Sequence, residues 1–327
     1  MGEDELVAVI RKVLSGGGPG VLVGPGDDAA VVASPRGTTV LTTDMLVEGV
    51  HFDRALTSAR DLGAKSIAVN VSDIAAMAAS PRYAVVSLGL SEADDPAWVV
   101  ELYGGMRAAS DEYALSLVGG DVNRAPVSVI SVTVVGEAAE GRAVLRSGAR
   151  PGDRIVVTGS LGAAAGGLLL ARSGNAAMAT DWGRDLLEAH FRPVARVGEG
   201  QTLAQSGARA MMDLSDGLLL DLSRLCAESA VGTRLELSSV PVSIGLLRLA
   251  EVLPCDPLEL ALSGGEDYEL VATIDPGAVD DARTRLLDRF GAALTDIGEI
   301  TGSGFVGVDA SGAEHPLEAR GWDHFGR

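Results

Sequence analysis

The sequence predicts a two-domain protein of mixed α/β (α+β) class. Three observations lead to this prediction: the chain has 327 residues, strand-like runs alternate with helix-like segments along its length, and a polar break interrupts the alternation. A chain of this length can bury two separate cores, and alternating strands and helices build sheets that helices cover. Hydrophobic residues make up 47% of the chain, which argues against extended disorder.

The elements of the first half follow from periodicity and turn residues. Apolar residues recur at helical spacing over 3–14, which predicts an amphipathic helix there. Two further stretches, one of them rich in alanine, predict helices over 59–79 and 96–112. Short apolar runs that end in turn residues predict strands at 21–23, 29–33, 38–43, 83–90, 116–120 and 127–137.

The domain junction is expected in the polar segment AAEGRAVLRSGARPGD (138–153), which is rich in Gly and Arg. It separates an N-terminal domain, 1–140, from a C-terminal domain, 141–327. The second half begins with a strand that leads through a glycine-rich turn into a helix. That strand and turn together occupy 154–162. The further predicted strands are 208–213, 234–240, 268–274 and short strands near the C-terminus, and the further predicted helices are 216–229 and 278–290.

The charge of the chain argues against nucleic acid as a partner. The chain carries 45 acidic and 26 basic residues, a formal net charge of −19, so it lacks the basic footprint that nucleic-acid binding requires. A generic acidic surface explains most of this excess, but a phosphate site on such a surface would need metal ions to offset the repulsion.

The cysteines, the first residues and the longest apolar stretch bear on redox chemistry and location. Cys226 and Cys255 lie far apart without a CxxC or nearby His, which argues against a disulfide scaffold or a zinc site. The first residues are acidic, unlike a secretory signal. The longest small-and-apolar stretch, 161–171, is too short for a bilayer. We therefore expect a cytoplasmic protein without a membrane partner.

Aspartates recur where predicted strands end or predicted helices begin. The carboxyl ends of strands are where ligands bind in open α/β sheets, whereas an Asp at a helix start can be an N-cap. Asp27, Asp28, Asp44, Asp121 and Asp213 are expected at strand ends, and Asp73 and Asp216 at helix starts beside a serine.

Turn or cap chemistry explains each aspartate singly, but the group favours Mg²⁺. This ion is held by one or two carboxylates together with waters and substrate phosphates. Thr42 and Thr43 offer further oxygens near Asp44, and Gly120 would let a backbone approach a nucleotide. Asp213 and Asp216 would share one face if a helix has begun there. Turn chemistry stays open as the alternative on pattern alone.

No glycine-rich phosphate loop is present in the sequence. Neither a Walker motif nor the protein-kinase motifs occur, and GGGPG (16–20) and SGGE (263–266) lack the GxGxxG spacing. Bound phosphates would therefore be held by metals and scattered arginines.

Eight segments carry a family resemblance that runs nearly end to end. They are GDDAAVV (26–32), TTDMLVEGVHF (42–52), KSIAVNVSDIAAMAASP (65–81), GGDVNRAP (119–126), RSGARPGD (146–153), DLSDGLLLDL (213–222), SGGEDYELV (263–271) and GWDHF (321–325). In this order the chain resembles thiamine-monophosphate kinases of the aminoimidazole-ribonucleotide-synthetase-like (AIR-synthetase-like) ATPase superfamily.

The resemblance implies a fold and a reaction. The N-terminal domain would bind ATP and Mg²⁺ and pair its strands with a second subunit in a homodimeric barrel, and the C-terminal domain would cover the nucleotide cleft. The reaction would be thiamine monophosphate plus ATP giving thiamine diphosphate plus ADP, with several Mg²⁺ ions. Because a phosphate oxygen is already ionised near neutral pH, we expect direct in-line transfer without a covalent or general-base residue.

The resemblance also implies roles for single residues. Those implied as Mg²⁺ ligands are Asp28, Thr42, Thr43, Asp44, Asp73, Asp121, Asp213 and Asp216, with Asp27 left as a turn residue. The implied nucleotide contacts are Tyr103, Gly120, Asp121, Arg146 and Ser215, and the implied substrate contacts are His51, Glu266 and Trp322.

The substrate contacts each have an alternative. Trp322 would stack on the substrate's thiazolium cation or plug an apolar surface, and Glu266 would face that cation or serve in a turn. His51 would hold the substrate phosphate or lie on the surface beside a buried Phe52. Lys65 is expected on a helix surface.

Rival functions remain within and outside the superfamily. Selenophosphate synthesis and hydrogenase maturation use a reactive Cys near the N-terminus or at the C-terminus, whereas this sequence has neither and ends in HFGR. A non-catalytic nucleotide or metal sensor is the rival from another class.

Overall fold

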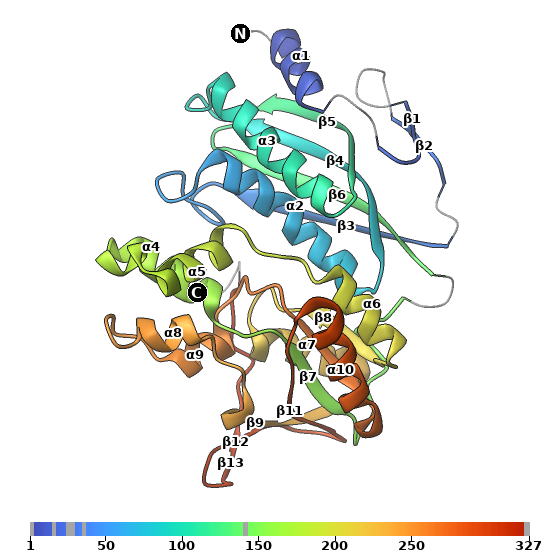
Figure 1. Cartoon of the computed structure of the whole chain (residues 1–327), viewed down its shortest axis with the longest axis vertical. Helices are drawn as coiled ribbons and strands as arrows, with labels where there is room; N and C mark the ends of the chain where they lie inside the picture. The colour runs from blue at the N-terminus through green and yellow to red at the C-terminus, as the bar shows by residue number, and fades with distance from the viewer. Residues whose placement is uncertain (1–2, 15–17, 24–29, 35–36, 140–142, 324–327) are drawn as a thin grey trace. The chain divides into compact units, whose positions relative to one another are not determined.

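The structure is a computed structural model of the chain, and it describes residues 3–14, 18–23, 30–34, 37–139 and 143–323. The chain divides into two compact units (Figure 1). Unit 1 contains residues 1–74 and 79–141, and unit 2 contains residues 75–78 and 142–327. Both units combine sheets with helices, which confirms the mixed α/β class.

A four-stranded sheet with the order β3-β6-β4-β5 forms the centre of unit 1. Its strands β4 and β5 are parallel, and the other neighbours are antiparallel. Helices α2 and α3 cover one face of the sheet (Figure 1), and α1 lies against α3. The bounds are α1 (Glu3–Val13), β1 (Val21–Val23), β2 (Val31–Val32), β3 (Thr38–Val47), α2 (Ala59–Ala76), β4 (Ser80–Leu90), α3 (Pro96–Glu112), β5 (Ser116–Arg124) and β6 (Val129–Ala138).

The opposite face of this sheet carries exposed apolar side chains. Successive side chains of a strand point to opposite faces, so Leu46 of β3 is buried while its neighbour Met45 is 54% exposed. Leu41 is 67% exposed and Val85 of β4 is 40% exposed. We call Leu41, Met45 and Val85 the open sheet face. Apolar residues gathered on one face of a sheet are typical of an interaction surface.

Unit 2 is built on a seven-stranded sheet with the order β13-β12-β9-β11-β7-β10-β8. Only the β12–β9 pair is parallel; the other neighbours are antiparallel. The strands are β7 (Arg154–Thr158), β8 (Ala210–Asp213), β9 (Gly232–Glu236), β10 (Leu270–Ile274), β11 (Leu294–Thr301), β12 (Phe305–Val308) and β13 (Glu314–Pro316).

Helices cover the sheet of unit 2 on both faces. One core joins the sheet to α6 (Val197–Gln205) and α10 (Val279–Phe290), and another joins it to α7 (Leu218–Ser229). A third cluster lies between α4 (Ala163–Ser173), α5 (Asp181–Phe191) and α8 (Ile244–Leu249), beside α9 (Pro257–Ser263). Short 3-10 turns occupy 176–179, 237–239 and 276–278. None of the described helices has the length and hydropathy needed to cross a bilayer.

Several strands and one side chain differ from the sequence-based expectation. The strand predicted at 234–240 ends at Glu236, and a 3-10 turn follows it. β3 runs to Val47 and β5 runs to Arg124, so both extend beyond the predicted 38–43 and 116–120. Their full length is paired, β3 with β6 and β5 with β4, and this pairing compensates for polar residues with low strand propensity. Lys65, expected on a helix surface, is only 2% exposed in α2.

Candidate active site

In unit 1, strand β3 and helix α2 bring together three of the predicted ligands. The Thr42 hydroxyl donates to the Asp73 carboxylate, and the Asp44 amide donates to Asn70 Oδ1 at 2.9 Å. Asp44 lies inside β3 rather than at its end, and Asp73 lies near the end of α2 rather than at its start, which corrects both expected positions. Because Thr42 and Asp44 are two residues apart in a strand, they face the same side, toward α2.

Thr43 lies between these two residues and points to the other face. Its hydroxyl donates to the carbonyl of Val132 at 3.0 Å and accepts from the Thr133 hydroxyl at 3.1 Å. Its side-chain oxygen is therefore used on the open side of the sheet. On the α2 side Thr43 can offer only its backbone.

Gly120 and Asp121 lie within β5, not at its end, which corrects the expected position of Asp121. A Cβ on Gly120 would lie 2.1 Å from the carbonyl oxygen of Val86 in β4, so the close approach of the two strands requires glycine here. Asp121 accepts from the side-chain amide of Asn123. The Asp121 side chain is exposed.

The two groups of unit 1 belong to opposite edges of one sheet. Asp44 pairs with Val132, Val132 with Val86, and Val86 with Gly120. Three strand spacings therefore separate Asp44 from Gly120, about 14 Å at 4.7–4.9 Å each. Within the described residues of unit 1, Asp44 and Asp121 do not belong to one cluster.

In unit 2, the loop 213–217 carries a second group of predicted ligands. Asp213 is the last residue of β8, as predicted, and is 3% exposed. Asp216 comes before α7, which begins at Leu218, so Asp213 and Asp216 do not share a helical face. The carboxylate of Asp216 accepts from Arg224 Nη1 at 2.6 Å.

Asp221 fixes the backbone of this loop from the first turn of α7. Its Oδ2 accepts the amides of Asp216 at 2.9 Å and of Gly217 at 3.2 Å, and its Oδ1 accepts from Arg224 at 2.8 Å. The residue is fully buried. Burial raises the pKa of its carboxyl to about 6, against the lowering effect of these hydrogen bonds.

Two predicted substrate contacts lie against the same loop. The Glu266 amide donates to the Ser215 carbonyl at 2.8 Å, and the Trp322 amide donates to the Asp216 carbonyl at 2.9 Å. Glu266 adopts φ +70°, a costly conformation for a non-glycine residue, and its carboxylate lies 3.2 Å from His190 Nδ1 of α5. The Trp322 side chain is 49% exposed. Unit 2 thus gathers predicted metal, nucleotide and substrate residues in one place.

The remaining predicted residues lie elsewhere. Arg146 is exposed, and its carbonyl accepts from the Ser229 hydroxyl at 2.9 Å. Tyr103 is 3% exposed in α3, where burial raises the pKa of its hydroxyl to about 12. His51 follows β3, and its Nδ1 accepts from the Val47 amide at 3.1 Å. Asp28 and Asp27 lie outside the described residues. The site roles of all these residues stay predictions.

Sequence reasoning missed three residues that orient the predicted ligands. Asn70 holds Asp44, while Asp221 and Arg224 hold Asp216. A signal was present for two of them, because Asn70 and Asp221 are isolated polar residues inside apolar helical runs. A polar side chain in such a position is buried and needs a hydrogen-bond partner.

The donor atoms fit a Mg²⁺ ion whose coordination shell is completed by waters and substrate phosphates. Among the described residues no three His, Cys, Asp or Glu side chains form a metal-binding group. Unit 1 nevertheless offers the Asp73 carboxylate beside the Thr42 hydroxyl, and unit 2 offers the carboxylates of Asp213 and Asp216 at the two ends of a short loop. Mg²⁺ is held in this way when waters and substrate phosphates complete its shell.

Comparisons with known proteins identify the family of the chain. Residues 26–138 match the family model for the AIR synthase related protein, N-terminal domain, and residues 150–310 match that for the C-terminal domain. The thiamine-monophosphate kinase of Escherichia coli K12 is 38% identical over 313 residues, which is 93% of this chain and 92% of the relative. That of Mycobacterium tuberculosis H37Rv is 39% identical over 86% of this chain and 84% of the relative.

Solved structures of thiamine-monophosphate kinases also match the chain. The thiamine-monophosphate kinase of Stenotrophomonas maltophilia K279a has a TM-score of 0.81 and 38% identity over 93% of this chain and 95% of that chain. The structure described as AaThiL complexed with AMPPCP and TMP has a TM-score of 0.80 and 34% identity over 99% and 97%. Escherichia coli HypE, at 18% identity and a TM-score of 0.80 over 98% of both chains, shares the fold alone. The chain belongs to the thiamine-monophosphate kinase family of AIR synthase related proteins.

Proposed function

We propose that this protein transfers the γ-phosphate of ATP to thiamine monophosphate, giving thiamine diphosphate and ADP. The observation that carries the proposal is the 38% identity to a thiamine-monophosphate kinase along 93% of the chain. A solved structure of 34% identity is described as complexed with TMP and with AMPPCP, which resembles ATP in shape and charge. The arrangement of the loop 213–217 supports the proposal, because predicted metal and substrate residues contact it.

The residues of unit 2 would bind and orient both reactants. The exposed ring of Trp322 offers a face for the thiazolium cation, and the Glu266 carboxylate, beside His190, adds negative charge for the same cation. Ser215 would contact a phosphate oxygen. Because Asp221 and Arg224 hold the backbone and carboxylate of Asp216, this carboxylate is oriented before any ligand binds.

We infer that Mg²⁺ is the metal and that each unit contributes oxygen donors of the kind that this ion prefers. The donors proposed are Asp28, Thr42, Thr43 (through its backbone), Asp44, Asp73, Asp121, Asp213 and Asp216. When bound, Mg²⁺ neutralises the repulsion between two anionic reactants and stabilises the charge that develops during transfer. The chain's own part is to align the phosphates, since an ionised phosphate oxygen needs no general base.

We also propose a homodimer, formed through the open sheet face. Within the described residues, no second strand pairs with the outer edge of β3 or of β5, and the exposed Leu41 and Met45 supply an apolar surface. A second copy would cover this surface and pair the free edges, which otherwise invite uncontrolled association. The cytoplasmic location stays a prediction.

A product assay tests the proposed function. The purified protein is incubated with ATP and Mg²⁺ and, in separate reactions, thiamine monophosphate, thiamine or other phosphorylated metabolites. We expect thiamine diphosphate and ADP in equal amounts with thiamine monophosphate alone. ADP release without a phosphorylated acceptor would indicate a different ATP-dependent reaction. Nucleotide binding without any turnover would indicate a sensor.

A further inference from the structure

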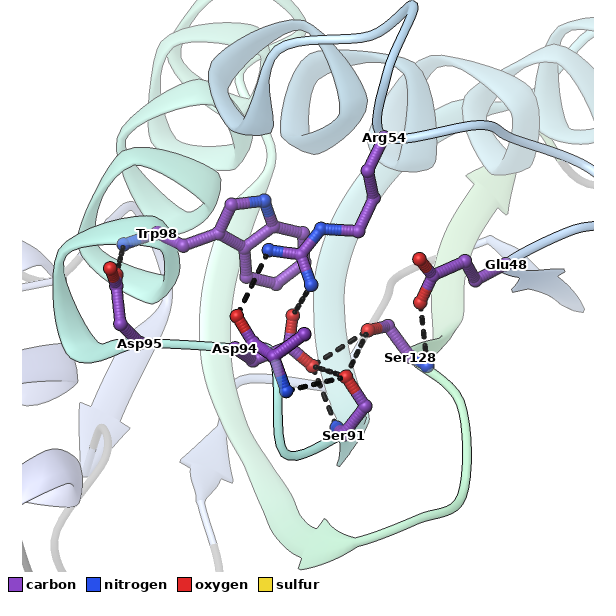
Figure 2. Close-up of polar contacts among 8 residues, drawn as sticks. Glu48, Arg54, Ser91, Asp94, Asp95, Trp98 and Ser128 are labelled. Carbon is purple, nitrogen blue, oxygen red and sulfur yellow. Dashed lines mark hydrogen bonds and ion pairs between the residues drawn. The ribbon is translucent and has the colours of Figure 1, made fainter.

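A fully buried carboxylate, Asp94, joins three separate segments of unit 1 (Figure 2). It accepts from the amide and hydroxyl of Ser91 at 2.7 and 3.0 Å, and from the Ser128 hydroxyl at 2.6 Å. Its other oxygen accepts from Arg54 Nη1. These contacts connect the turn before α3, the turn before β6, and the segment that follows β3.

Arg54 is held on two further sides. Its guanidinium lies over the ring of Trp98, 4.6 Å from the centroid, and its Nη2 donates to the Ala93 carbonyl at 3.4 Å (Figure 2). Trp98 is itself fixed, because Asp95 caps α3 by accepting the Trp98 amide at 2.7 Å. Ion pairing and stacking together leave the Arg54 side chain only 22% exposed.

The same network holds the other end of the segment through Ser128. The Glu48 amide donates to the Ser128 carbonyl at 3.0 Å, and the Ser128 amide donates back to Glu48 Oε2 at 3.2 Å (Figure 2). Since the Ser128 hydroxyl donates to Asp94, the segment 48–54 is fastened at Glu48 and at Arg54 to one buried group.

His51 lies between these two attachment points. Its amide donates to the Val47 carbonyl at 2.9 Å, and its Nδ1 accepts from the Val47 amide at 3.1 Å. The proton of the neutral ring is therefore on Nε2. Phe52, 7% exposed, anchors the next position. The imidazole is therefore held against the end of β3, within the turn that Glu48 and Arg54 fasten on either side.

We propose that Asp94 is a positioning residue that presents His51 to the phosphate group of the substrate. This inference rests on the proposed function. A well-packed apolar cluster would join the three segments without the desolvation that a buried ion pair requires. Directional hydrogen bonds to one carboxylate instead fix the orientation of the turn, as a preorganised binding site needs.

The test separates positioning from general stability. The Michaelis constants for thiamine monophosphate and for ATP are measured for wild type, Asp94→Asn, Arg54→Gln, the double variant and His51→Ala, at a temperature where circular dichroism shows every protein folded. Asp296→Asn is the matched control, since Asp296 accepts two hydrogen bonds from Arg154, at 2.8 and 2.9 Å, in unit 2.

We expect Asp94→Asn and Arg54→Gln each to raise the KM for thiamine monophosphate about tenfold, as a lost charge-assisted contact does, with the KM for ATP changed less than twofold. The double variant should resemble the single ones, because the pair acts as a unit. Asp296→Asn should lower the melting temperature and leave both constants unchanged.

Three results would overturn the proposal while leaving the kinase function in place. They are unchanged constants in the Asp94 variant, equal increases for both substrates, and the same increase in the Asp296 control. An unchanged KM in His51→Ala would remove the role of His51 and this inference with it. A wild-type protein that forms no thiamine diphosphate would instead overturn the proposed function itself.

Discussion

At the scale of single residues, Asp73 and Asp213 are the two carboxylates whose removal tests the metal-assisted account in each unit. Asp73→Asn keeps an oxygen that can accept from Thr42, and Asp213→Asn removes a charge at a position that is 3% exposed. Neither change should unfold the protein. We expect each to lower kcat by about 10²-fold or more, because a preorganised electrostatic contact is lost.

The matched control for these variants is Asp111→Asn. Asp111 pairs with Arg107 on the exposed side of α3, where ion pairs contribute little. Its kcat and melting temperature should stay close to those of wild type. Near-normal turnover in the Asp73 variant would remove that residue from the metal site.

Gly120 lies where strand β5 approaches strand β4 too closely for a larger side chain. In Gly120→Ala the new Cβ would lie 2.1 Å from the Val86 carbonyl oxygen, whereas in Gly119→Ala it would lie 3.7 Å from the nearest atom, a methyl carbon of Val85. We expect Gly120→Ala to lower the free energy of unfolding by about 1–3 kcal/mol, as overpacking does. Gly119→Ala should be neutral. Urea unfolding of both variants measures the difference, and equal stabilities would contradict the strand packing described.

At the scale of elements, Asp267 holds the start of α4 with a buried carboxyl. Its oxygens accept the amides of Gly162 at 2.7 Å and Ala164 at 3.2 Å. Burial raises its pKa to about 7 despite these bonds. Since the unfolded pKa is about 3.9, the folded state binds an extra proton between about pH 4 and pH 7. Wild type should lose stability as the pH rises through this range.

Asp267→Asn removes that proton uptake. Measured by urea unfolding between pH 4 and pH 8, the variant should gain stability relative to wild type as the pH rises. The gain has an upper bound of about 4 kcal/mol, from 1.36 kcal/mol per pKa unit. The carboxyl of Asp221 titrates in both proteins and cancels in the difference. A difference that is constant with pH would contradict the raised pKa of Asp267.

The sequence predicts most of the elements, and its errors have physical causes. Helix α3 matches the predicted 96–112, because a cap, a proline and regular apolar spacing define it. Asp44 and Asp121 lie inside strands because cross-strand pairing outweighs the weak strand propensity of aspartate. Helices α5, α6, α8 and α9 were not predicted, and α8 and α9 are too short for a clear periodic signal.

The sequence predicts which residues belong to the candidate site, but not which buried residues hold them in place. Motif resemblance named Asp213, Asp216 and Glu266, and the structure brings their segments together around the loop 213–217. The burial of Lys65 and the role of Asn70 depend on which face of α2 packs inward, and the role of Asp94 depends on how the turn before α3 packs. Tertiary packing decides this, so local sequence patterns could not show it.

At the scale of the whole molecule, the open sheet face predicts dimerisation. In Met45→Glu a charge replaces a side chain that is 54% exposed on the free chain, so a dimer through this face would have to bury that charge. Sedimentation should give about 67 kDa for wild type, twice the 33.4 kDa of the chain, and the monomer mass for the variant. Ile244→Glu, at a 76% exposed position of α8, is the control and should stay dimeric. A monomeric wild type would contradict the proposed interface.

Phosphate transfer from ATP to thiamine monophosphate can be followed by phosphorus NMR of both substrates, first with Mg²⁺ and then with excess EDTA. The account predicts that thiamine diphosphate and ADP appear one to one, and that both stop forming when the metal is removed. Metal-dependent transfer would be contradicted if thiamine diphosphate formed equally fast in EDTA. Transfer to thiamine monophosphate would be contradicted if ADP formed without thiamine diphosphate.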